Sequence, residues 1–77
     1  MDEVDNMRRA EWAHAALDAF GQLTGQRDYD YRADETFREI AGDLLADLLH
    51  AADMAGVDPD ELIEIGRWHY DEEVNEE

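Results

Sequence analysis

In the second half of this sequence, residues that end one helix are followed directly by residues that start the next. Gly56 can adopt the left-handed backbone conformation that ends a helix. Two residues later, Asp58 suits the N-cap of a new helix, Pro59 its first position and Glu61 its third. This combination is a capping box with proline at a position where its missing N–H costs nothing. It predicts a sharp turn between two helices.

Apolar residues at helical spacing predict two longer helices before this turn. The first is capped by Asp2 or Asp5 and ends at Gly25. The second has Asp34 as its N-cap, and its apolar stripe is wide enough to pack against more than one helix. The stripe consists of Phe37, Ile40, Ala41, Leu44, Leu45, Leu48, Leu49, Ala51, Ala52 and Ala55. The expected helices cover about residues 2–24, 34–55 and 58–74.

The chain has 77 residues, of which 44% are apolar, so we expect one small folded domain rather than a disordered chain. Three helices with short connections predict an all-α fold, a small three-helix bundle over residues 1–77 with 75–77 as a frayed acidic tail. The apolar residues of the third helix fall on two faces. We expect Trp12 and Trp68 to complete the core of the monomer, and a homodimer contact is the alternative use of the two faces of the third helix. Gly66, inside the third helix, is expected to allow a close helix approach or to leave room for an aromatic side chain.

Acidic residues dominate the charge of the chain. Six Arg and no Lys stand against 22 Asp and Glu, which gives a net charge of −16. This charge argues against direct binding to DNA, RNA or an anionic membrane, and it favours a basic protein partner, a metal cation or solubility in high salt. The chain has no Cys and no Ser, which excludes disulfides, thiolate metal sites and a Ser-His-Asp triad. Without an apolar run of about 18 residues or a signal peptide, we expect a cytoplasmic protein of a prokaryotic cell.

Most of the negative charge lies in the second and third helices. Residues 28–77 contain 17 acidic residues and three Arg. Four of these acids are spaced by four residues along one side of the second helix, and we call them the acidic ladder: Glu35, Glu39, Asp43 and Asp47. Like charges at this spacing cost a few tenths of a kcal/mol per pair, and a bound cation or a basic partner would offset that cost. On the third helix, Asp60, Glu61 and Glu64 continue the acidic pattern.

Regularly spaced carboxylates on a stiff helix have a charge pattern like that of a nucleic acid, because DNA is itself a rod of closely spaced negative charge. Short, acidic, Cys-free helical proteins resemble the small inhibitors of phages and mobile elements, including anti-CRISPR and anti-restriction proteins that mimic DNA. That resemblance implies a non-enzymatic inhibitor that blocks a cationic groove of a nucleic-acid-processing protein, such as a CRISPR effector or a nuclease.

The predicted partner contacts are the acidic ladder, the three acids of the third helix, and a loop between the first two helices. The loop supplies Tyr29, Tyr31 and Arg32, because Tyr and Arg are enriched among the residues that dominate binding energy. The alternative is a small interaction domain whose acidic surface only maintains solubility.

A second resemblance covers residues 43–58 alone. This apolar helix, which ends in a Gly-Val-Asp turn, is similar to the helix and turn of MazG-type nucleotide pyrophosphohydrolases, an all-α family. The resemblance implies a degenerate magnesium- and nucleotide-binding protein in which Asp43 is a magnesium ligand and Glu39 a second one. The family's Glu three residues before that Asp falls here on Ile40, an apolar core candidate.

Histidine adds one further metal alternative. Asp43, Asp47 and His50 are four and three residues apart, so they share a helix face and, together with Glu39, could form half of a divalent metal site. The ordinary alternative is a surface histidine that makes simple hydrogen bonds. We predict no catalytic residue, no metal and no cofactor, with magnesium at these four residues as the alternative.

Overall fold

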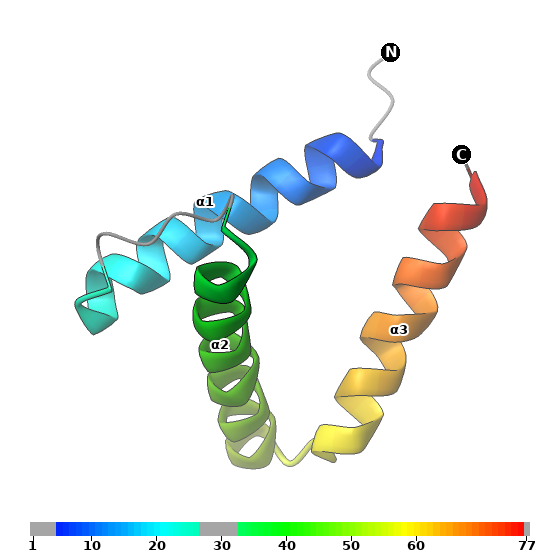
Figure 1. Cartoon of the computed structure of the whole chain (residues 1–77). Helices are drawn as coiled ribbons and strands as arrows, with labels where there is room; N and C mark the ends of the chain where they lie inside the picture. Colours follow the sequence, from blue (N-terminus) through cyan, green and yellow to red (C-terminus); the bar gives the residue numbers. More distant parts are fainter. Residues whose placement is uncertain (1–4, 27–32, 77) are drawn as a thin grey trace.

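Three α-helices make up the computed structural model, which describes residues 5–26 and 33–76. The helices are α1 (Asn6–Thr24), α2 (Asp34–Ala55) and α3 (Pro59–Glu76), and no strand occurs among these residues. The predicted fold class, a small all-α three-helix bundle, is confirmed. α2 and α3 form a V, α1 crosses the N-terminal part of α2, and the N-terminal end of α1 lies near the C-terminal end of α3 (Figure 1).

Two of the three helices begin at aspartates that cap them. The Asp5 carboxylate accepts a hydrogen bond from the Arg8 backbone N–H at 2.9 Å. The Asp58 carboxylate accepts one from the Asp60 backbone N–H, also at 2.9 Å. Because the first N–H groups of a helix have no partner inside it, these bonds fix where α1 and α3 start. The capping role predicted for Asp58 is confirmed.

The start of α2 differs from the prediction. Ala33, in extended conformation, occupies the N-cap, and no side chain caps this end. Asp34 was expected there but lies one residue later, inside the first turn, where its charge still suits the helix dipole. Its carboxylate is 3.9 Å from the Arg38 guanidinium one turn along. The Phe37 N–H donates to the Ala33 carbonyl at 3.0 Å, which is why the helical hydrogen bonds already begin at the alanine.

Glycines end the first two helices, as the sequence predicts. Gly25 and Gly56 have φ values of 83° and 77°, the left-handed region that residues with a Cβ rarely adopt. After Gly56, the Val57 N–H reaches back to the Ala52 carbonyl at 2.8 Å, so the end of α2 is held and the chain turns into α3. α3 continues two residues beyond the expected end at residue 74, through Glu76.

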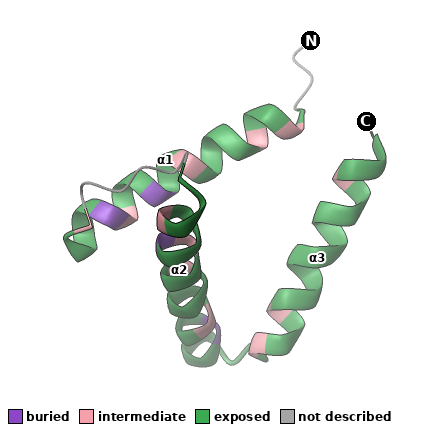
Figure 2. Cartoon of the chain, viewed as in Figure 1, coloured by how far each residue is buried: buried purple, intermediate pink, exposed green. Residues whose placement is uncertain are grey.

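The buried core is small and lies where the helices meet. Leu17 of α1 and Ile40 of α2 are buried at the α1–α2 crossing, and Ile40 is only 1% exposed. Ala52 is the other buried apolar side chain of the described residues. α2 packs against both other helices, as its wide apolar stripe predicts. α3 has no buried residue among those described (Figure 2).

Large apolar side chains remain exposed over much of the described chain. The prediction that both tryptophans complete the core is wrong, since Trp12 is 57% and Trp68 61% exposed. The radius of gyration is 13.9 Å, against about 11.5 Å expected for a compact chain of this length. The cause is the open V, which leaves α3 attached to the rest of the molecule along only part of its length (Figure 1).

Candidate protein-binding surface

The acidic ladder lies on the exposed side of α2. All four carboxylates are solvent-exposed, and none makes an ion pair or hydrogen bond with the described part of the chain. Successive members are about 6 Å apart along the axis and about 40° apart around it, so the ladder is about 18 Å long and covers one side of the helix. Arg38, which could have neutralised part of it, is directed to Asp34 instead.

The apolar face of α2 lies opposite the ladder. Leu45 and Leu48 face α3. At about 100° per residue, the midpoint of these two leucines lies about 170° around the helix from the midpoint of the ladder. The ladder therefore points away from α3, and all four of its residues are exposed. A partner can contact it without disturbing the core.

The acids of α3 do not join the ladder in one surface. Asp60, Glu61 and Glu64 are exposed, but they lie about 160° around α3 from the residues that face α2. The two acidic groups therefore point to opposite sides of the molecule. A single cationic surface of a partner can therefore contact the ladder, but not the acids of α3 at the same time. The predicted contacts Tyr29, Tyr31 and Arg32 lie outside the described residues.

No metal cluster forms within the described residues 5–26 and 33–76, where no three His, Asp or Glu side chains are close enough to hold an ion. His50, the nitrogen ligand of the metal alternative, is exposed. Ile40 occupies the position of the glutamate in the MazG-like pattern, and its side chain is buried against α1. A buried isoleucine offers no ligand, so the magnesium alternative gains no support from this packing.

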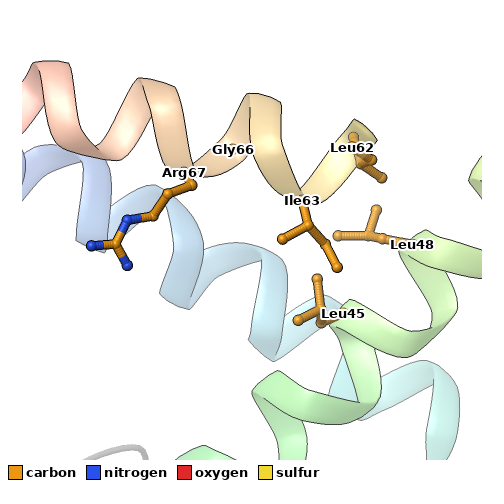
Figure 3. Close-up of a pocket in the computed structure, with 6 residues that line it drawn as sticks. All are labelled: Leu45, Leu48, Leu62, Ile63, Gly66 and Arg67. Atoms are coloured by element: carbon orange, nitrogen blue, oxygen red, sulfur yellow. The ribbon is translucent and has the colours of Figure 1, made fainter. Parts of the chain in front are cut away.

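An apolar groove between α2 and α3 is the feature that the sequence reasoning did not locate. It encloses about 430 Å³ and is lined by Leu45, Leu48, Leu62, Ile63, Gly66 and Arg67. Figure 3 shows the four aliphatic side chains directed toward one another across the V, with Arg67 extending away from them. The two apolar faces predicted for the third helix were the available signal, but their partner depends on how the helices cross.

Gly66 lines this groove without the close contact that was predicted for it. A Cβ atom built there meets nothing within 4 Å. Neither a helix nor an aromatic side chain of the described residues therefore fills the space beside it. Within one chain, the expectation of a close approach is wrong.

Comparison with protein-family models, with curated proteins and with solved structures found no match for this chain. Among the described residues, no helix has the length and apolar character needed to cross a bilayer.

Proposed function

We propose that this protein acts by binding rather than by catalysis, and that its acidic ladder occupies a cationic groove of a nucleic-acid-processing protein such as a nuclease or a CRISPR effector. In that groove the carboxylates stand in for nucleic-acid phosphates opposite Arg or Lys, and they keep the nucleic acid out. The observation that supports this most strongly is the ladder itself: four exposed carboxylates on one side of a 22-residue helix, with no cation of the described chain paired to them.

The spacing limits how much of a nucleic acid the ladder can imitate. Duplex DNA has one charge per about 1.7 Å of axis, whereas the ladder has one per about 6 Å. It therefore competes for a few cationic positions rather than for a full binding footprint. At about 0.2–1 kcal/mol for each exposed pair, four pairs contribute about 1–4 kcal/mol, which is about four-fold to about 1,000-fold in affinity.

The test compares two variants with the same change in charge. The ladder variant is E35Q/E39Q/D43N/D47N. The control variant, E11Q/D18N/E72Q/E76Q, neutralises four exposed acids on α1 and α3 outside the predicted contacts. Parent and variants are immobilised and exposed to the DNA-binding fraction of a prokaryotic lysate, and the retained proteins are challenged with duplex DNA.

We expect the parent and the control variant to retain the same basic proteins, and duplex DNA to displace them. The ladder variant should bind them about four-fold to about 1,000-fold more weakly. Equal retention by all three proteins would show that the ladder does not bind a partner. Retention that duplex DNA leaves unchanged would overturn the mimicry, because a partner bound through its nucleic-acid site must release one ligand to accept the other.

A further inference from the structure

The chain exposes more surface than a folded monomer of its mass. Its accessible area is 6389 Å², whereas a monomeric protein of 8.9 kDa is expected to expose about 4,800 Å². The excess is about 1,600 Å². The eleven residues that are not described account for part of this excess, and one partner's share of a standard protein–protein interface is about 800 Å².

Three exposed apolar side chains lie along the groove between α2 and α3. Leu45 and Leu48 are each 48% exposed and Ile63 is 46% exposed, although all three point into the V (Figure 3). Tyr70 and Val74 extend the apolar face of α3 toward its C-terminal end and are also exposed. Apolar side chains that gather on one face, rather than lying singly, are typical of an interaction site.

We propose that a second copy of this chain covers the groove, so that two α2–α3 hairpins pack across a two-fold axis into a four-helix bundle. α2 and α3 are about 33 Å and about 27 Å long, so the helices of two such hairpins can lie side by side over most of their length. A two-fold interface joins the same patch of both copies, so that patch must be self-complementary. An apolar groove flanked by half-exposed aliphatic side chains meets this requirement, because each copy offers side chains and a space to receive them.

The placement of charge allows this association despite a net charge of −16 on each chain. The acidic ladder lies on the opposite side of α2 from the leucines of the groove, so the two ladders remain on the outside of the dimer. At the rim of the groove, the Arg67 guanidinium is paired with the Asp71 carboxylate at 3.1 Å, and this pair partly neutralises the charge of Asp71. This inference does not depend on the proposed function, because it concerns a different face of α2.

The open space beside Gly66 supports the dimer independently of the exposed area. Glycine inside a helix is less favourable than alanine, and nothing in the described chain uses the space above it. A helix of the second copy would use that space, because a residue without a Cβ lets two helix backbones approach closely. Gly42 of α2 is the matched control: its added Cβ also meets nothing within 4 Å, and it does not line the groove.

The experiment measures mass by analytical ultracentrifugation, from low micromolar to submillimolar concentration, for the parent, Gly66→Ala and Gly42→Ala. We expect the parent to have twice the mass of one chain, Gly42→Ala to dimerise as the parent does, and Gly66→Ala to raise the dimer dissociation constant at least ten-fold. Circular dichroism verifies that both variants keep their helix content, and both substitutions are mild enough to leave the helices formed.

Three outcomes would overturn the proposal. A parent that is folded and remains at the mass of one chain over the whole range would show that another molecule, or none, covers the groove. A dimer that both variants weaken equally would place the interface elsewhere. A dimer that Gly66→Ala leaves unchanged or strengthens would show that no helix approaches α3 at this position.

Discussion

Alanine at position 21 of α1 should destabilise the fold, although alanine forms helices better than glycine. A Cβ atom on Gly21 would lie 2.9 Å from the Gln26 carbonyl oxygen and 3.4 Å from Ile40 Cδ1. The first of these atoms belongs to the backbone of the turn that ends α1. That turn is held by a hydrogen bond of 2.7 Å from the Gln26 N–H to the Gly21 carbonyl. The added methyl therefore meets a fixed group and not a flexible side chain.

The magnitude follows from two opposed terms. Helix propensity favours alanine by about 1 kcal/mol, whereas forcing a methyl group into a packed contact and weakening the Gln26 hydrogen bond costs about 2–3 kcal/mol. Gly21→Ala should therefore lower the free energy of unfolding by about 1–2 kcal/mol, and the melting temperature by about 5–15 °C for a chain of this size.

Urea denaturation followed by circular dichroism measures this change, with all proteins at one concentration so that self-association does not alter the comparison. Gly42→Ala is the control, and it should raise the free energy of unfolding by about 1 kcal/mol, because its Cβ meets only open space. If Gly21→Ala stabilises the protein as much as Gly42→Ala does, then α1 and its terminal turn do not approach each other as described.

Substitutions at three further positions test other contacts by the same denaturation assay. Ile40→Ala, at the most buried side chain described, should cost about 2–5 kcal/mol, and a loss below about 1 kcal/mol would contradict its place in the core. Asp58→Ala removes the carboxylate that accepts the Asp60 N–H and should cost about 1 kcal/mol, whereas Asp58→Asn should keep most of the stability. Arg9→Ala removes the 3.5 Å ion pair with Glu73 that ties α1 to α3, and it should cost no more than about 1 kcal/mol, with a smaller loss at high salt.

Local chemistry made much of the fold predictable from the sequence. The turn between α2 and α3 depends on residues within one stretch, and each acts on its own backbone: Gly56 by its left-handed conformation and Asp58 by its capping carboxylate. The wide apolar stripe of α2 likewise predicted packing against two helices, because a helix with apolar residues over half its circumference needs more than one neighbour.

The misjudged features depend on how helices meet. Apolar character alone suggested buried tryptophans, but burial requires neighbours that cover the whole ring. In the open V both rings stay more than half exposed, although Trp68 meets the His69 ring edge-on. The ladder could be placed on one side of α2 from spacing alone. Whether Glu64 and its neighbours on α3 would join it depended on the relative rotation of two helices, which no local signal encodes. The alanine N-cap of α2 shows that a good capping residue is not used when the helix begins one position earlier.

Salt should weaken the binding of a partner to the ladder face of α2 and strengthen self-association through the groove face. Raising the salt concentration from about 0.05 M to about 0.5 M shortens the Debye length from about 14 Å to about 4 Å. Screening weakens the attraction between the ladder and a cationic partner, so retention of that partner should fall. The same screening reduces the repulsion between two chains of charge −16, while the apolar groove is unaffected by it, so self-association should become tighter.

Ultracentrifugation and partner retention, measured on one preparation, test both predicted salt effects. If both associations weaken with salt, then the copies are joined by ion pairs and not through the groove. If both strengthen, then the partner is bound through apolar contacts and the ladder is only a solvated surface.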